Sequence, residues 1–166
     1  MQNKKQLGQF YTKNADYILQ NLIKDFDNDL HFIDPFAGEG DLMIYYPNTI
    51  GYDIDVKRSD IKYNNSLLNP IDYSGKYIIT NPPYLAKNKN KDKTFYDKYN
   101  VNDLCKASMK SIMGCEGGIL IIPLNFFCDE DNEFRKYFLT NYYIKNINIF
   151  EEQVFDDTSI TVCSFS

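Results

Sequence analysis

The segment from 117 to 123, GGILIIP, constrains the fold of this chain more than any other stretch. Four large apolar residues follow one another in it, with no polar residue between them. A strand of this kind has two apolar faces, and such strands occur in parallel sheets that are covered by helices on both faces. The segment therefore predicts a central strand of an α/β sheet.

Strands and helices alternate along the rest of the chain. Apolar and β-branched runs predict further strands at 30–34, 49–55, 61–64, 76–80, 143–150 and 159–165. Helices are predicted at 14–26, 37–46, 101–113 and 132–142. The last two strands follow each other closely and predict a hairpin. The expected fold is a Rossmann-like, mostly parallel seven-stranded sheet with an antiparallel C-terminal hairpin strand.

Composition narrows the class of protein. A chain of 166 residues fits one domain, and 43% hydrophobic residues, with 14 Tyr and 12 Phe, exclude a disordered chain. No signal peptide and no apolar run of about 20 residues is found, so an intracellular, cytoplasmic protein is expected. The net charge of −5 argues against nucleic acid binding over the whole surface but leaves room for a local basic face.

No metal site is expected from the sequence. The four cysteines form no C-x-x-C pair, and His31 is the single histidine. This spacing does not suit a structural zinc site or a disulfide framework, so the cysteines are expected to be reduced and packed as small hydrophobic residues.

Two segments at predicted strand ends indicate a nucleoside-containing cofactor. DPFAGEG, from Asp34 to Gly40, is a glycine turn that a ligand can approach closely, and Asp53 ends the next strand, where a carboxylate can accept both ribose hydroxyls. The glycines do not follow G-x-G-x-x-G, and no Walker lysine is present. S-adenosylmethionine is therefore the cofactor that fits best.

The stretch YIITNPPYLAKN, from Tyr77 to Asn88, runs from a strand into Asn81, two prolines and a tyrosine that looks exposed. Pro82 and Pro83 lack an N–H group, and each restricts the residue before it to extended conformations. The segment is therefore stiff, rich in hydrogen-bond acceptors and poor in donors.

Five segments in order, LGQFYT, DPFAGEG, GYDID, NPPY and VFDDTSITVCSF, resemble the gamma class of DNA adenine-N6 methyltransferases. The resemblance extends from Leu7 to Phe165. It rests on the leading LGQFYT and on the order of the motifs, because NPPY alone is shared by glutamine, adenine and some guanine methyltransferases. It implies a class I methyltransferase fold, S-adenosylmethionine as methyl donor and DNA with a flipped-out adenine as substrate, in a restriction-modification or similar system.

The resemblance assigns part of the cofactor site. Phe10 and Thr12 would close over the methionine end of the cofactor. Asp34, Phe36 and Gly38 would surround its amino-acid portion.

The adenosine end of the cofactor is assigned in the same way. Asp53 would hold the ribose, and Ile54 would pack on the adenine ring. Asn65 is the nearest match to the acidic residue that usually contacts the adenine amine in this class.

The substrate site follows from NPPY and the last strand. The resemblance implies that the Asn81 side chain and the Pro82 carbonyl accept hydrogen bonds from the target amine. Tyr84 would stack on the flipped base, and Phe165 would form a second aromatic wall.

A lysine-rich segment, 86–100, follows the tyrosine. Its lysines predict a flap that contacts DNA phosphates, although a merely solvated loop explains the composition equally well. The predicted phosphate contacts are Lys87, Lys89, Lys91 and Lys93.

Two alternatives to a complete DNA methyltransferase stay open. One is a methyltransferase that acts on a protein glutamine or on RNA through the same NPPY geometry. The other is a cofactor-binding fragment or subunit that is inactive alone, because the gamma class carries a target-recognition domain after the last strand and this sequence ends at Ser166. The expected unit is thus a catalytic domain, 1–166, that takes target recognition from elsewhere.

Overall fold

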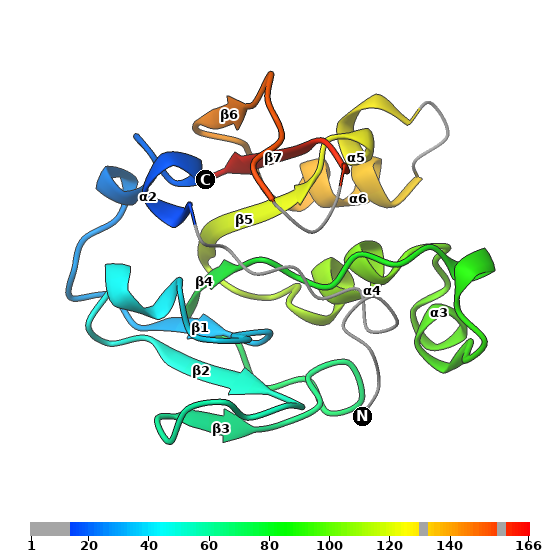
Figure 1. The fold of residues 1–166 in the computed structure, drawn as a ribbon, viewed down its shortest axis with the longest axis horizontal. Coiled ribbons are helices and arrows are strands. Elements are labelled where there is room, and N and C mark those ends of the chain that lie inside the picture. Colours follow the sequence, from blue (N-terminus) through cyan, green and yellow to red (C-terminus); the bar gives the residue numbers. More distant parts are fainter. Residues whose placement is uncertain (1–13, 130–132, 156–158) are drawn as a thin grey trace.

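A computed structural model describes residues 14–129, 133–155 and 159–166. Its centre is one seven-stranded sheet (Figure 1). The strands are β1 (Phe32–Asp34), β2 (Ile50–Asp53), β3 (Ile61–Tyr63), β4 (Tyr77–Thr80), β5 (Gly117–Pro123), β6 (Ile147–Ile149) and β7 (Val162–Phe165).

The strands are ordered β3-β2-β1-β4-β5-β7-β6, and the pairs from β3 through β5 are parallel. β7 lies between β5 and β6 and runs antiparallel to both. This confirms the predicted fold class, including the antiparallel C-terminal hairpin. From β1 the chain first builds outward to β3 and then returns to place β4 on the other side of β1, so the strand order reverses between β1 and β4.

The helical segments are short. They are α2 (Ala15–Ile18), η1 (Ile23–Asp25), η2 (Met43–Tyr45), η3 (Lys87–Lys89), α3 (Thr94–Tyr99), α4 (Leu104–Ser111), α5 (Asn125–Cys128) and α6 (Glu133–Asn141). The helices predicted at 101–113 and 132–142 correspond to α4 and α6. Within the described ranges, no helix has the length and apolar character needed to cross a membrane.

The helix predicted at 14–26 is shorter in the structure. After α2, Asn21 adopts a left-handed backbone conformation with φ of 68°, and the chain resumes as the 3-10 turn η1. The carbonyl of Ile18 accepts hydrogen bonds from the side chains of Asn148 and Ser164 on the hairpin strands. Tertiary contacts therefore take a carbonyl that a longer helix would have used.

The helix predicted at 37–46 is also wrong in extent, because only η2 forms there. Gly38 and Gly40 have φ of 56° and 81°, which an α-helix does not accommodate. Tyr46 ends the segment with its ring stacked on Phe32, at 3.9 Å between centroids, and its hydroxyl donates to the carbonyl of Ile23. The segment is thus a glycine loop anchored by a buried tyrosine.

The lysine-rich segment contains a helix, α3, that the sequence reading did not predict. Just before α3, the Asp92 carboxylate accepts from the amide of Thr94, the first residue of the helix, at 2.9 Å. Tyr96 is fully buried, and its hydroxyl donates to the carbonyl of Leu85. Helix α4 lies beside α3 in Figure 1. Between them, Tyr96 packs with Leu67 and Leu104 in a second hydrophobic cluster.

β5 is the centre of the main core, as its sequence predicts. Ile119, Ile121 and Ile122 are fully buried. At the start of the strand, Gly118 packs directly against β4, and a Cβ atom there would lie 2.0 Å from the carbonyl oxygen of Ile78. Backbone atoms of a central strand cannot move aside as a flexible side chain can, so only glycine fits.

Replacing Gly118 should therefore destabilise the protein strongly. We expect Gly118→Ala to lower the free energy of unfolding by roughly 3 kcal/mol or more, because the added methyl group forces β4 and β5 apart. Gly75→Ala is the matched control: φ is +68° there, but nothing lies within 4 Å of the added Cβ. It should cost only about 1 kcal/mol. Equal losses in urea denaturation would contradict the contact between the strands.

Candidate active site at the switch point of the sheet

A pocket lies where the strand order reverses, beyond the carboxyl ends of β1, β2 and β4. In open α/β sheets this is the position at which ligands bind. The cavity measures about 80 Å³, so a nucleoside would extend out of it. Its lining includes most of the residues expected to hold a cofactor, together with the asparagine of NPPY: Asp34, Phe36, Gly38, Asp53, Ile54, Asn65 and Asn81.

Asp53 fastens the glycine loop to the end of β2. Its Oδ2 accepts from the amide of Gly38 at 2.8 Å, and its Oδ1 accepts from the amide of Asp55, also at 2.8 Å. The side chain is 4% exposed, and burial raises its pKa. Each carboxylate oxygen has a second lone pair, so both oxygens can still accept from a ligand.

Asp34 is the most deeply buried acid of the site, at 1% exposure. Its Oδ1 accepts from the hydroxyl of Thr80 at 2.7 Å and from the amide of Phe36 at 3.1 Å. Burial raises its pKa to about 7, against the effect of these two bonds, and the negative charges of Asp53 and Asp41 add to the rise. The Thr80 bond links the ends of β1 and β4, so Asp34 fixes the geometry of the switch point.

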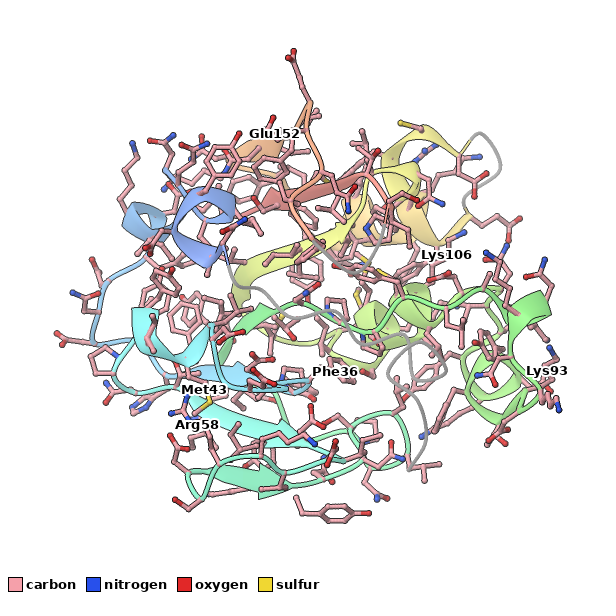
Figure 2. The ribbon with its side chains drawn as sticks, viewed as in Figure 1. Phe36, Met43, Arg58, Lys93, Lys106 and Glu152 are labelled. Carbon is pink, nitrogen blue, oxygen red and sulfur yellow. The ribbon has the colours of Figure 1, made fainter. Side chains whose placement is uncertain are left out.

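Arg58 holds the other side of the glycine loop, a role that the sequence analysis missed. Its Nη1 donates to the carbonyls of Glu39 and Gly40, each at 3.3 Å, and its Nε and Nη2 bind the carboxylate of Asp60. Figure 2 shows Arg58 beside Met43, next to the loop. The connection 54–60 between β2 and β3 is short and has no helix, and it brings Arg58 back over the loop. Its shortness was the sequence feature that could have indicated this contact.

The expected adenosine side of the pocket is anchored by α3. Ile54 is 42% exposed at the rim, and Asn65 accepts from the amide of Leu68 at 3.2 Å. The carbonyl of Leu67, two residues after Asn65, accepts from Lys98 at 2.7 Å and from the hydroxyl of Tyr99 at 2.8 Å. The segment after NPPY therefore supports this wall of the pocket.

NPPY begins directly after β4. Asn81 and Pro83 line the pocket, whereas Pro82 is buried and is not part of the lining. Asn81 and Asp34 thus reach one pocket from the ends of two neighbouring strands, as the sequence predicts.

The tyrosine of NPPY is not exposed, contrary to the expectation from the sequence. Tyr84 is 4% exposed and belongs to the main core. Its hydroxyl donates to the carbonyl of Ile121 at 2.7 Å and contacts the side chain of Asn81. The physical reason is that Pro82 and Pro83 have no N–H to continue the β4–β5 ladder, so the phenol takes the next carbonyl of β5. In this arrangement the ring face is not offered to a base.

Phe165 does not reach this pocket. It is 2% exposed and packs edge-on against Phe127 and Phe138, at centroid distances of 5.5 and 6.2 Å. It lines a different, larger cavity of about 960 Å³, together with Gly117 and Gly118 at the start of β5. The antiparallel register, which sets Phe165 opposite Leu120, places it at the middle of β5 rather than at its carboxyl end.

The four lysines of the predicted flap divide into two pairs. Lys87 forms a 2.5 Å ion pair with Asp97, and the Lys93 ammonium donates to the carbonyls of Lys87 and Asn90. Lys89 and Lys91 are exposed. Figure 2 shows Lys93 at the outer edge of the α3 segment, far from Phe36. Lys87 and Lys93 therefore stabilise the segment, and Lys89 and Lys91 are left as the better candidates for phosphate contacts.

Two expected cofactor residues, Phe10 and Thr12, lie outside the described residues. Over the residues that the structure does describe, no cluster of His, Cys, Asp and Glu side chains could hold a metal ion. The four cysteines are free thiols.

Comparisons with solved structures identify the fold. One match is a protein of Listeria monocytogenes assigned as a class I S-adenosylmethionine-dependent methyltransferase, with a TM-score of 0.59 and 15% identity over 91% of this chain and 55% of the other. A second is the modification subunit of an assigned type I restriction enzyme from Vibrio vulnificus, with a TM-score of 0.65 and 18% identity over 95% and 44%. The chain has the class I methyltransferase fold.

This chain spans about half the length of these two structures. No protein-family model and no curated protein matches it.

The buried Asp34 predicts a pH dependence of stability. Folding raises the pKa of Asp34 from 3.8 to about 7. Between pH 4 and pH 7, Asp34 is therefore ionised in the unfolded chain and protonated in the folded protein. The contribution of Asp34 to stability therefore falls as pH rises from about 4 to 7. We expect Asp34→Asn, whose Oδ1 can keep both hydrogen bonds, to gain roughly 2–4 kcal/mol relative to wild type across this range.

The control is Asp72→Asn. Hydrogen bonds from Ser74 lower the pKa of this exposed carboxyl, so its contribution has the opposite sign. Urea denaturation at a series of pH values measures both variants. A constant difference between wild type and Asp34→Asn would show that Asp34 does not titrate in this way.

Proposed function

We propose that the chain is an S-adenosylmethionine-dependent methyltransferase that modifies the exocyclic N6 amine of adenine in DNA. The observation that carries the proposal is the convergence of Asn81, Asp34 and Asp53 on one pocket at the switch point of a class I methyltransferase fold. The motif order from LGQFYT to VFDDTSITVCSF supports DNA as substrate, and the Vibrio vulnificus modification subunit agrees with it.

The described residues suit a nucleoside-containing methyl donor. Gly38 lines the pocket and presents no Cβ atom to the ligand, and Asp53 places a carboxylate at the end of β2. Asp53 would hold the ribose, Ile54 would cover the adenine ring and Asn65 would accept from the adenine amine. The cofactor, when bound, supplies an electrophilic methyl group.

The chemistry of the chain itself lies in its acceptors. An adenine amine is a weak nucleophile because its lone pair is delocalised into the ring. Asn81 Oδ1 would accept one N–H group of the amine, and the Pro82 carbonyl would accept the other. Because Pro82 does not line the pocket in this structure, its carbonyl would have to turn toward the amine. The two acceptors would hold the nitrogen toward tetrahedral geometry and aim the lone pair. Such positioning and preorganised polar contacts supply most of the rate, and the amine becomes acidic once it is methylated, so no strong base is required.

A second candidate is a subunit that binds the cofactor and transfers methyl groups only together with another polypeptide. The rings of Tyr84 and Phe165 are buried, and Lys87 and Lys93 are engaged within the chain. Among the described residues, the rim therefore offers few groups that could stack on or steer a flipped base. Calorimetry with S-adenosylmethionine together with a methylation assay on short DNA duplexes distinguishes this candidate, because it predicts cofactor binding without methylation of DNA.

The acceptor role of Asn81 is directly testable. We expect Asn81→Ala to reduce transfer of labelled methyl groups to unmethylated genomic DNA by a factor on the order of 10²–10³, since it removes a contact to the reacting amine. Binding of S-adenosylmethionine should stay within about twofold, because Asn81 faces the substrate rather than the ribose.

Asn141→Ala, on the remote helix α6, is the matched control and should retain wild-type activity. Mass spectrometry of the product checks for N6-methyladenine, and parallel assays with RNA and with protein test the other NPPY substrates. An Asn81→Ala variant as active as wild type would exclude the assigned role.

Lys89 and Lys91 should contribute to DNA affinity through phosphates. Replacing both with alanine should reduce the slope of log affinity against log salt by about 1.8, since each phosphate contact contributes about 0.9. The double variant Lys24→Ala/Lys136→Ala removes the same charge from η1 and α6 and should leave the slope unchanged. Fluorescence anisotropy with a short duplex measures both, and an unchanged slope for the loop variant would favour a merely solvated loop.

A further inference from the structure

Helix α3 binds one wall of the candidate pocket through two adjacent side chains. The Lys98 ammonium donates to the carbonyls of Leu67 and Leu68, each at 2.7 Å. The Tyr99 hydroxyl donates to the same Leu67 carbonyl at 2.8 Å. The ammonium also lies over the Tyr99 ring, 5.1 Å from its centroid, so the two side chains support each other. These contacts join a helix that follows NPPY to the turn that follows β3.

That turn lines the pocket. Asn65 and Leu67 are both part of the lining, and Leu67 is buried. The amide of Leu68 donates to the carbonyl of Asn65 at 3.0 Å and to its side-chain Oδ1 at 3.2 Å. The orientation of the Asn65 carboxamide therefore depends on where the N–H group of Leu68 points.

The planarity of the peptide bond links the two sets of contacts. The carbonyl of Leu67 and the amide of Leu68 belong to one peptide unit and cannot turn independently. Because Lys98 and Tyr99 fix the carbonyl, they also fix the N–H group on the opposite side of the unit. β3 is an edge strand, paired with β2 on one side, so the turn takes its outer support from α3.

We propose that Lys98 and Tyr99 are positioning residues of the pocket: they hold the peptide plane between Leu67 and Leu68 and thereby fix the Asn65 carboxamide where the adenosine end of the cofactor would lie. The ammonium makes charge-assisted hydrogen bonds, which are stronger than neutral ones, and the hydroxyl holds the same oxygen as a second donor. Lys98 thus serves the cofactor side of the pocket rather than DNA phosphates. This inference rests on the proposed function for its ligand but not for its geometry.

The test uses the double variant Lys98→Met/Tyr99→Phe, which keeps most of both carbon frameworks and removes all the donors to the turn. We expect the Kd of S-adenosylmethionine, measured by calorimetry, to rise roughly tenfold. The probe 5′-methylthioadenosine has the adenosine but not the amino-acid portion, so its Kd should rise by the same factor. In methyl transfer, the KM for S-adenosylmethionine should rise while kcat at saturating cofactor stays within about twofold.

The double variant Lys145→Met/Tyr142→Phe is the matched control. It removes the same two groups at the other cavity, where Lys145 pairs with Asp25 at 3.1 Å and the Tyr142 hydroxyl donates to the Cys115 carbonyl at 3.1 Å. It should lower the melting temperature and leave the Kd of both ligands unchanged.

A second measurement needs neither cofactor nor activity. In ¹⁵N-labelled protein, the backbone amide of Leu68 should exchange with solvent roughly tenfold faster or more in Lys98→Met/Tyr99→Phe than in wild type, because the turn opens more often. The control variant should leave this exchange rate unchanged.

The outcomes separate the two proposals. Unchanged affinity for S-adenosylmethionine in Lys98→Met/Tyr99→Phe, or equal exchange of the Leu68 amide in this variant and wild type, would overturn the positioning role. A loss seen with S-adenosylmethionine but absent with 5′-methylthioadenosine would overturn it too, since the effect would then lie at the methionine end. A wild-type protein that binds neither ligand would overturn the proposed function, and the exchange of Leu68 would then decide the positioning role by itself.

Discussion

The direct contact between the backbones of β4 and β5 is the constraint on which the rest of the structure depends. Gly118 has no Cβ, which lets the two strands pair at their starts, and the parallel register then sets Thr80 opposite Leu120. The position of NPPY follows from where this register ends. Asn81 leaves β4 into the pocket, and the Ile121 carbonyl remains beside it for the Tyr84 hydroxyl.

The glycine loop is held on two sides by charged residues. Asp53 accepts from the amide of Gly38, and Arg58 donates to the carbonyls of Glu39 and Gly40. These contacts hold the loop although only the short η2 follows it. The connection from β2 to β3 has no helix either. These two contacts therefore provide order that a helix would otherwise provide.

The pocket places two buried carboxyl groups, Asp34 and Asp53, beside the hydrogen-bond acceptor of Asn81. Asp34 and Asp53 both have pKa values raised by burial, and each is partly compensated by backbone or hydroxyl donors. Keeping them buried beside Asn81 costs stability, which is a frequent property of functional sites. The second hydrophobic cluster, around Tyr96 and Leu67, supports the same pocket from the side of α3.

The sequence by itself determined the strands, their order of occurrence and the pocket residues that stand at strand ends, such as Asp34, Asp53 and Asn81. These follow from short-range patterns: apolar runs form strands, and the residue after a parallel strand reaches the carboxyl edge of the sheet. Only the tertiary structure decided that Tyr84 turns inward, that Phe165 faces another cavity, that Lys93 binds loop carbonyls and that Arg58 reaches the glycine loop. Each of these depends on which distant backbone group lies within reach of a side chain, and local sequence does not encode that distance.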